Sequence, residues 1–145
     1  MTTLIKGGTI IAADRSYVAD VLIEGETIKA IGTGLTADKT IDATDCLIMP
    51  GGIDPHTHLD MPFMGTSSAD NYDTGTKAAL SGGTTMVVDF CIPDRGQPLM
   101  DAIAAWDKRA ELATTDYAYH MCITYWSDKV REDMAKVVDH GVTTF

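Results

Sequence analysis

The chain has 145 residues, of which 45% are hydrophobic and 22% charged, an ordinary globular composition that excludes a disordered chain. Its formal net charge of −10 would repel phosphate backbones and anionic lipid headgroups, so we expect a small neutral substrate and no nucleic-acid or membrane partner. No apolar run approaches the roughly 20 residues that span a bilayer, and residues 1–6 lack the basic-then-apolar order of a signal peptide, which favours a cytoplasmic protein.

The first 49 residues alternate short β-prone runs with Gly and Asp. These runs span residues 4–5, 9–11, 20–24, 27–31 and 40–42. Gly7-Gly8, Gly25-Glu26 and Gly32-Thr33-Gly34 supply the turns, so the pattern predicts a small antiparallel unit of hairpins. Such a unit needs a partner sheet to close its core.

From residue 47 onward, apolar strand-like runs alternate with amphipathic helical patterns. The run 47–53 is broken by Pro and Gly at its far end and predicts a buried strand that ends in a site loop. A helix is expected over 69–81, capped by Asp70 and ended by Gly82-Gly83. The elements that follow alternate in the same way: a strand over 84–90, a helix over 99–112, a strand over 117–123, a helix over 129–140 and a β-prone run over 142–145.

The alternation of strands with helices predicts an α/β fold. Strands that are apolar on both faces indicate a parallel sheet covered by helices, and this pattern leaves both doubly wound and barrel folds open. The last β-prone run reaches Phe145, and a full barrel needs about 250 residues. We therefore expect the chain to be a fragment of a longer protein, because an unfinished parallel sheet leaves an open edge.

The segment Pro50-Gly51-Gly52-Ile53-Asp54-Pro55-His56-Thr57-His58 carries the most specific chemistry. Side chains two residues apart on an extended chain point to the same side, so His56 and His58 can present both imidazoles to one metal ion. They follow a predicted strand, at the end where barrel enzymes keep their sites. Asp54 or a nearby carbonyl could orient one ring. The pair by itself also fits two surface histidines.

Together with the preceding β-rich unit, the motif Pro-Gly-Gly-Ile-Asp-x-His-x-His resembles the amidohydrolase superfamily. Its continuation, His58-Leu59-Asp60-Met61-Pro62-Phe63, is similar to dihydropyrimidinases and hydantoinases, and the similarity extends over the whole chain. The resemblance implies a TIM-type (β/α)8 barrel, of which only the first half is present, with a small N-terminal β-sandwich. Residues 1–49 would supply strands of the sandwich domain, and residues 50–145 the first βα units of the barrel.

The resemblance also implies two zinc ions per subunit. In the family a histidine pair, here His56 and His58, binds the more buried metal, and a carboxylated lysine bridges both metals. That lysine is expected immediately after Phe145. The general-base aspartate, the oxyanion tyrosine and the remaining ligands are expected further along, so no catalytic residue is mapped onto this chain.

The implied reaction opens a cyclic amide, such as dihydrouracil or a hydantoin, to an N-carbamoyl amino acid by attack of a metal-bridging hydroxide. Dihydroorotases usually have an arginine after the histidine pair, and Asp60 in its place favours a neutral ring over a carboxylate-bearing one. Met61, Phe63 and Met64 fit a substrate-pocket wall or simple packing equally well. An allantoinase-like amidohydrolase and a non-catalytic scaffold relative remain alternatives. The resemblance further suggests a homotetramer.

Three cysteines fit structural roles. Cys46, Cys91 and Cys122 are odd in number, widely spaced and embedded in apolar runs, which predicts reduced, buried thiols and argues against a disulfide framework or zinc knuckle. No sequence neighbour is arranged to activate any of them, so a catalytic thiol is disfavoured.

Five further residues are also assigned structural roles. His120 is expected to be a hydrogen-bonded buried histidine and His140 a cation at a helix end. Asp89 is expected to be a hydrogen-bonded structural carboxylate. Trp106 and Trp126 are expected to anchor the core or an interface.

Overall fold

The computed structural model describes all residues, Met1–Phe145, and the chain divides into two compact units, Met1–Pro50 and Gly51–Phe145. The first unit contains only strands, and the second combines strands with helices, so the chain is α/β as predicted. No helix is both long and apolar enough to cross a membrane.

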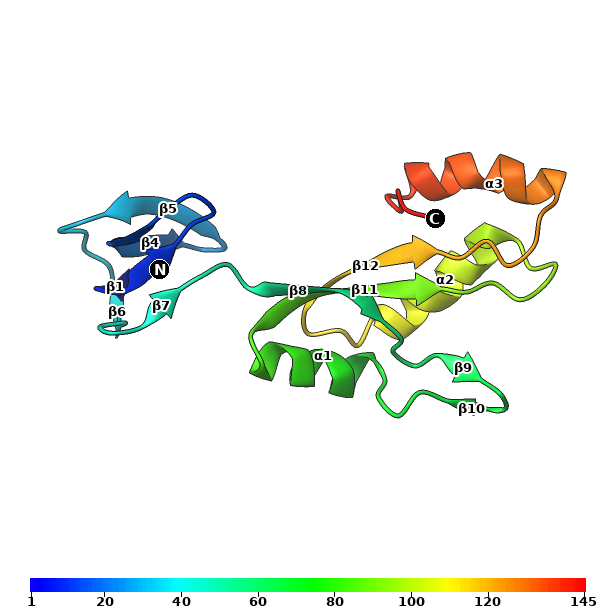
Figure 1. Ribbon diagram of the computed structural model, residues 1–145, viewed down its shortest axis with the longest axis horizontal. Coiled ribbons are helices and arrows are strands. Elements are labelled where there is room, and N and C mark those ends of the chain that lie inside the picture. The colour runs from blue at the N-terminus through cyan, green and yellow to red at the C-terminus, as the bar shows by residue number, and fades with distance from the viewer. The chain divides into compact units, whose positions relative to one another are not determined.

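The first unit consists of seven strands in two sheets (Figure 1). The strands are β1 (Thr2–Lys6), β2 (Thr9–Ile11), β3 (Ser16–Val18), β4 (Asp20–Glu24), β5 (Thr27–Gly32), β6 (Lys39–Asp42) and β7 (Leu47–Ile48). Their orders are β5-β4-β1-β6 and β3-β2-β7. All five predicted β-prone runs fall within strands. The expectation of a wholly antiparallel unit is wrong, because β1 pairs with β6 and β2 with β7 in parallel after the chain crosses over.

A small apolar cluster joins the two sheets of the first unit. Ile10 of β2 and Val21 of β4 are buried in it together with Ala19, and Ile48 of β7 packs against them. Ile28 and other apolar side chains of β5 remain largely exposed. The unit therefore buries only part of its apolar surface within this chain.

The apolar run 47–53 is not one buried strand, as the sequence suggested. It divides into β7, which pairs with β2 in the first unit, and β8 (Gly52–Thr57), which pairs with β11 (Thr84–Cys91) in the second. Pro50 separates the two strands because it has no backbone N–H to donate to a sheet. β8 is an edge strand whose residues are mostly exposed in this chain.

The second unit is built on three parallel strands in the order β12-β11-β8, where β12 spans Asp116–Met121. Its helices are α1 (Tyr72–Ser81), α2 (Leu99–Ala110) and α3 (Asp128–Asp139). A small hairpin of β9 (Pro62–Phe63) and β10 (Thr66–Ser67) follows β8. The predicted order of strands and helices is confirmed as far as α3.

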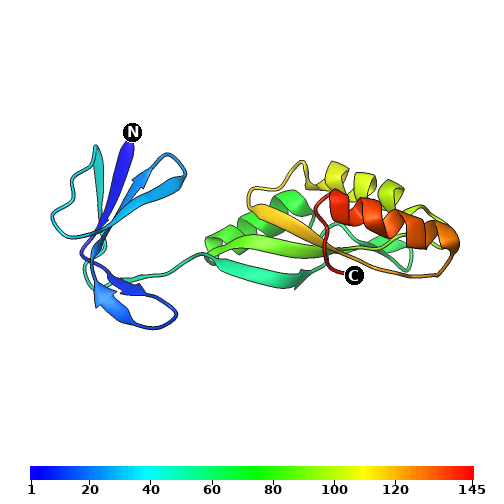
Figure 2. The ribbon, with the colours of Figure 1, turned by 90° about the horizontal axis from the view of Figure 1, so that it is seen from above.

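The helices cover one face of this sheet, as Figure 2 shows. Cys91 of β11 and Met121 of β12 are fully buried in the core beneath the helices, where they pack with residues such as Ile103 of α2. The alternate residues of the same strands, including Phe90 and His120, are only half-buried. Of the two arrangements that the sequence left open, helices on one face of the sheet fit a barrel, whereas a doubly wound sheet has helices on both faces.

The helix ends differ from prediction by a few residues. α1 begins after Asn71, whose side chain accepts a hydrogen bond from the Thr74 backbone N–H. The expected cap, Asp70, instead accepts from the Thr74 hydroxyl. Asn and Asp have nearly equal preferences for the N-cap position, so residue type alone does not show which of Asp70 and Asn71 caps the helix. The predicted end at Gly82-Gly83 is confirmed, with Gly83 at φ +87°.

The β-prone run 142–145 does not form the predicted fourth strand. It makes one isolated parallel bridge, between His120 and Thr144, and the Met121 backbone N–H donates to the Thr144 carbonyl at 3.0 Å. A single bridge orders these residues beside β12 without building a ladder.

Some predicted core residues lie at the surface. Trp106 of α2 is 5% exposed, as expected for a core anchor, whereas Trp126 is 65% exposed. All three cysteines are free, and Cys91 is buried, but Cys46 is exposed and Cys122 is half-buried. Burial raises the pKa of the Cys91 thiol to about 12, which keeps it protonated and unreactive. An apolar neighbourhood in sequence did not guarantee burial, because edge strands and loops leave one side open.

Asp133 of α3 gives a testable pH dependence. Its side chain is 1% exposed and pairs with Lys129 at 2.6 Å and Lys136 at 3.0 Å. The hydrogen bond from Lys129 is the main cause that lowers the pKa of Asp133 below 3.8. A lowered folded-state pKa gives stability that is present above pH 3.8 and lost as the pH falls through the folded-state value.

We therefore expect the Tm of Asp133→Asn to fall less than that of the wild type as the pH decreases below 3.8, measured by thermal unfolding across acid pH. Asp139→Asn, which changes an exposed carboxylate at the end of the same helix, is the matched control and should keep the wild-type profile. An unchanged acid profile in Asp133→Asn would contradict the assignment.

Candidate metal centre

Strand β8 and the residue that follows it place two imidazoles side by side. His56 is the fifth residue of β8, and His58 comes directly after the strand. Their ring centroids are 5.1 Å apart at an interplanar angle of 85°. Both side chains are exposed in this chain, so they are accessible to a ligand.

Phe90, near the carboxyl end of β11, lies between three histidines. Its ring centroid is 4.5 Å from that of His56, 5.1 Å from His58 and 4.9 Å from His120 of β12. We call these four residues the histidine cluster. His56 lies on β8 and His58 directly after it, whereas Phe90 lies on the neighbouring β11 and His120 on β12. Phe90 and His120 alternate with the residues that are buried beneath the helices, so they face the side of the sheet that the helices leave open.

His120 belongs to this cluster, but both of its ring nitrogens are engaged. Nε2 lies 3.0 Å from the Pro55 carbonyl oxygen, and Nδ1 lies 2.6 Å from Thr144 Oγ1. A carbonyl only accepts, so Nε2 donates, and in the neutral ring Nδ1 accepts from the threonine. His120 is thus hydrogen-bonded as predicted, but it is half-buried, not buried. The His120 side chain therefore holds the backbone next to His56, and neither of its ring nitrogens is free to bind a metal.

Asp54 supports the backbone of the histidine pair. Its Oδ1 accepts a hydrogen bond from the His56 backbone N–H at 3.1 Å. The carboxylate therefore fixes the chain direction at His56, whereas the sequence suggested that it could orient a ring.

Asp89 holds the segment that follows His58. It is fully buried on β11, and its Oδ2 accepts from the Leu59 backbone N–H at 3.0 Å and from the Tyr72 hydroxyl at 2.8 Å. Its Oδ1 accepts from the Phe90 backbone N–H at 2.7 Å. Burial raises the pKa of Asp89, and these three hydrogen bonds oppose that increase. The predicted role as a hydrogen-bonded structural carboxylate agrees with this geometry.

Helix α1 also fixes this segment. A Cβ added at Gly75 would overlap the Leu59 side chain, so the glycine lets α1 approach the residue after His58 closely. The Asp60 backbone N–H donates to the Asp70 carbonyl at 2.8 Å. Contacts from β11, from α1 and from Asp70 just before α1 thus position Leu59 and Asp60.

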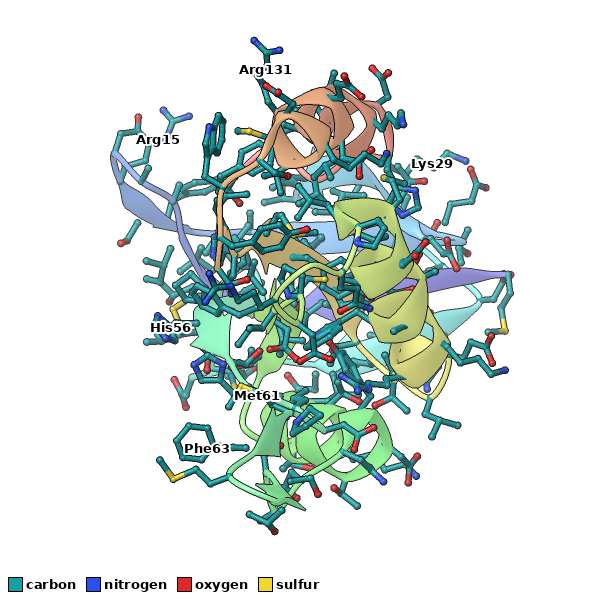
Figure 3. The ribbon with its side chains drawn as sticks, turned by 90° about the vertical axis from the view of Figure 1, so that its right-hand side faces the viewer. Arg15, Lys29, His56, Met61, Phe63 and Arg131 are labelled. Atoms are coloured by element: carbon teal, nitrogen blue, oxygen red, sulfur yellow. The ribbon has the colours of Figure 1, made fainter.

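The predicted substrate loop forms the hairpin of β9 and β10. Its two turn residues, Met64 and Gly65, have φ of +48° and +81°, the signs required by a type I′ turn. Met61 is half-buried, whereas Phe63 is 57% and Met64 90% exposed. Figure 3 shows Phe63 projecting away from the ribbon. Simple packing under the loop therefore does not account for Phe63 and Met64.

The donor set fits part of a metal site. Two imidazoles are ligands that zinc binds readily, and their separation brings both within reach of one ion. No group of three or more His, Cys, Asp or Glu side chains lies close enough to hold a metal by itself. A metal held here would need ligands in addition to His56 and His58.

Sequence reasoning identified the histidine pair but missed Phe90 as its neighbour. Phe90 pairs in register with His120, and both stand near the carboxyl ends of predicted parallel strands. Side-chain alternation from the predicted strands would have placed them on one face.

The chain is similar to known proteins along nearly its whole length. The chain matches the Amidohydrolase family over residues 47–145. It is 48% identical to the dihydropyrimidinase of Dictyostelium discoideum over 99% of this chain and 30% of that protein. It is also 48% identical to the D-hydantoinase of Geobacillus stearothermophilus, over 100% of this chain and 32% of that protein.

The crystal structure of a dihydropyrimidinase from Brevibacillus agri superposes with a TM-score of 0.95 at 49% identity, over 99% of this chain and 32% of that chain. The chain thus spans about a third of the length of these relatives. The resemblance drawn from the sequence is confirmed. The family match includes both His56 and His58 and most of the chain, and the chain therefore belongs to the amidohydrolase family.

Proposed function

We propose that the whole protein is a metal-dependent hydrolase that opens a neutral cyclic amide, a dihydropyrimidine such as dihydrouracil or a hydantoin, to an N-carbamoyl amino acid. The observation that carries the proposal is the pair of adjacent imidazoles, His56 and His58, at the carboxyl end of a parallel strand. Such pairs supply nitrogen ligands to zinc. The similarity to dihydropyrimidinases and D-hydantoinases gives the substrate class.

In this proposal His56 and His58 hold a metal, and the rest of the cluster keeps their rings in place. When bound there, a metal would supply polarisation of the amide carbonyl and a lowered pKa of its bound water. Asp54 fixes the backbone at His56, and Asp89 fixes it just after His58. Asp60, two residues after His58, has its Oδ2 3.9 Å from Arg109 Nε, and a carboxylate at this position favours a neutral ring over a carboxylate-bearing substrate.

We further propose two zinc ions per subunit, with a carboxylated lysine directly after Phe145 as the bridging ligand. Thr144 supports this placement, because its bridge to His120 holds the end of the chain beside the histidine cluster. A lysine one residue beyond Phe145 would extend from the same segment. The exposed Phe63 and Met64, with Met61, are proposed to wall the substrate pocket.

The proposed architecture is a (β/α)8 barrel with an N-terminal β-sandwich. Helices on one face of three parallel strands favour a barrel over a doubly wound sheet, which has helices on both faces. Residues 1–49 would belong to the sandwich and 50–145 to the barrel. The apolar side chains left exposed on β5 are consistent with further strands covering the first unit. We propose a cytoplasmic homotetramer.

Ring opening by the full-length protein tests the proposal. Dihydrouracil and hydantoin are supplied separately before chelation, after chelation and after zinc is restored with bicarbonate present. We expect turnover that chelation abolishes and zinc restores, because loss of the metal removes carbonyl polarisation. Turnover that chelation does not affect would contradict metal dependence. Zinc-loaded protein that turns over only allantoin, or nothing, would point instead to an allantoinase-like enzyme or a scaffold.

A further inference from the structure

Strand β8 has an irregular pairing with β11 at the position of the histidine pair. Residues 54–57 of β8 lie opposite residues 87–89 of β11, so β8 has one residue more than β11 in this interval. Pro55 and His56 together thus face a single residue of β11, which is the arrangement of a β-bulge. A bulge changes the direction in which a side chain points. The direction of the His56 imidazole therefore depends on the geometry of this bulge.

Two backbone groups in the bulge are paired by side chains of β8 itself. The His56 backbone N–H donates to Asp54 Oδ1 at 3.1 Å, and the Thr57 hydroxyl donates to the Val88 carbonyl at 3.3 Å. A bulge leaves its extra residue out of the ladder, so such groups need partners other than the facing backbone. Both contacts are local, because they join β8 to itself or to the strand beside it.

His120 of β12 supplies a third contact, from two strands away. Its Nε2 donates to the Pro55 carbonyl at 3.0 Å, although β11 lies between β12 and β8. On β11, Phe90 packs between the rings of His120 and His56, with centroid distances of 4.9 and 4.5 Å. Pro55 has no backbone N–H, so its carbonyl is the backbone group through which a hydrogen bond can fix it.

Thr144 orients the imidazole that makes this contact. Its hydroxyl oxygen lies 2.6 Å from His120 Nδ1, and its carbonyl accepts from the Met121 backbone N–H at 3.0 Å. When Nδ1 accepts from the threonine, the proton of the neutral ring lies on Nε2, which is the donor that the Pro55 carbonyl requires. Thr144 therefore fixes both the orientation and the tautomer of His120.

We propose that His120 is a positioning residue of the metal centre, which holds the bulge of β8 so that the His56 imidazole points toward the metal. His120 itself binds no metal, because both of its ring nitrogens are engaged within the protein. The inference rests on the proposed function, since it requires that His56 and His58 hold zinc. It adds that zinc affinity depends on a contact made from β12.

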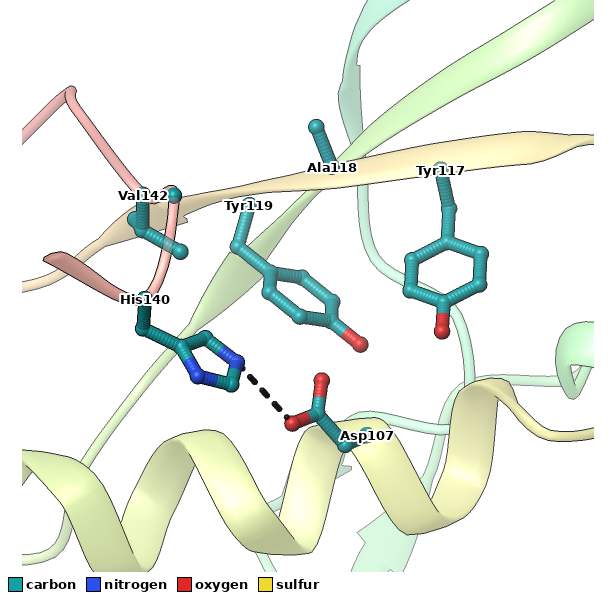
Figure 4. A pocket seen from close by; sticks show the side chains of 7 residues that line it. Asp107, Tyr117, Ala118, Tyr119, His140 and Val142 are labelled. Atoms are coloured by element: carbon teal, nitrogen blue, oxygen red, sulfur yellow. Dashed lines mark hydrogen bonds and ion pairs between the residues drawn. The ribbon is translucent and has the colours of Figure 1, made fainter. Parts of the chain in front are cut away.

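The zinc affinity of the full-length protein, measured in graded zinc buffers, tests this role. His120→Ala removes both hydrogen bonds and should lower the affinity about 10- to 100-fold, as is typical for residues that orient metal ligands. His140→Ala is the matched control. It removes another histidine, whose Nε2 lies 3.2 Å from Asp107 outside the histidine cluster (Figure 4), and should keep the zinc affinity of the wild type.

Two amide variants test the hydrogen bond to the Pro55 carbonyl. His120→Gln carries an NH₂ group at about the reach of the imidazole Nε2, so it can still donate to the carbonyl and should recover most of the zinc affinity. His120→Asn has the same amide on a shorter side chain, which cannot reach the carbonyl, and should bind zinc as weakly as His120→Ala. The comparison of these two variants holds even if His120→Ala does not fold.

Thr144→Val tests the orientation of the ring. It removes the hydroxyl next to Nδ1 and should lower zinc affinity about three- to tenfold. In the His120→Ala background the same change should have little further effect, because Thr144 acts through the imidazole. Thr124→Val is the control: it removes a hydroxyl that donates to the Pro93 carbonyl at 3.0 Å, outside the histidine cluster, and should leave zinc affinity unchanged.

These measurements separate positioning from a role in stability alone. If His120 only stabilised the fold, His120→Ala would lower Tm and keep the zinc affinity of the wild type, which would overturn the inference. Equal zinc affinities of His120→Gln and His120→Asn would overturn the role of the Pro55 contact. A wild-type protein that bound no zinc would overturn the proposed function together with this inference, whereas unchanged affinity in His120→Ala would overturn the inference alone.

Discussion

Replacing His56 or His58 by alanine is expected to lower the zinc affinity of the full-length protein by more than about 100-fold and to abolish ring opening. Changes in residues that merely orient metal ligands already cost about 10- to 100-fold, so removal of a direct ligand should cost more. The two rings are 5.1 Å apart and exposed in this chain, so neither is buried as part of the hydrophobic core. Metal content after dialysis against a graded zinc buffer measures the effect.

His140→Ala is the matched control for these variants. It makes the same substitution at another exposed histidine, which pairs with Asp107 and lies outside the histidine cluster. Its zinc content should equal that of the wild type. If His56→Ala and His58→Ala both kept wild-type zinc stoichiometry, neither residue could be a ligand, and the proposed centre would be wrong.

The sequence predicted the second unit well because its signals are local. Hydrophobic periodicity gave the strand and helix order, and the Gly82-Gly83 end of α1 was found because a glycine at positive φ is the usual helix stop. The choice of Asn71 over Asp70 as the cap was missed, because both side chains accept from the first turn and only the tertiary contacts distinguish them.

The long-range pairings could not be predicted from the same signals. Nothing in the run 47–53 shows that Ile48 pairs with β2 while Ile53 pairs with β11, because strand partners far apart in sequence leave no local pattern. The parallel pairing of β1 with β6 was missed for the same reason. The local hairpin signals predicted antiparallel neighbours, whereas the chain crosses over between these strands and pairs them in parallel.

Within the candidate centre, His56 and His58 were found from their two-residue spacing, which is a local property. Phe90 and the bracing hydrogen bonds of His120 depend on strand order and register across three strands. Alternation along each predicted strand indicates which residues share a face, but which strands are neighbours, and so which side chains meet, follows only from the assembled sheet. The exposed Cys46 shows the opposite error, in which an apolar neighbourhood in the sequence suggested burial.

Replacing Asp89 by alanine is expected to destabilise the full-length protein by about 3–5 kcal/mol, measured by denaturant unfolding. The change leaves three donors without their acceptor: the Leu59 and Phe90 backbone N–H groups and the Tyr72 hydroxyl. Each buried unpaired donor costs about 1–3 kcal/mol, and water entering the vacated space recovers part of the sum. Asp116→Ala, at an exposed position at the start of β12, should cost less than about 0.5 kcal/mol.

Asp89→Asn distinguishes a stabilising carboxylate from one that also positions the metal ligands. Its amide oxygen can still accept, but its NH₂ group faces donors, so we expect a cost of about 1–3 kcal/mol with the fold retained. Tyr72→Phe removes one of the donors, and combining it with Asp89→Asn should therefore cost less than the sum of the two single changes.

Because Asp89 holds Leu59 directly after His58, Asp89→Asn should also lower zinc affinity by about 10- to 100-fold. If the Asp89→Asn protein were destabilised but kept the zinc affinity of the wild type, Asp89 would stabilise the fold without positioning the metal ligands. If the free-energy costs of Asp89→Asn and Tyr72→Phe were strictly additive, the two side chains would not be coupled.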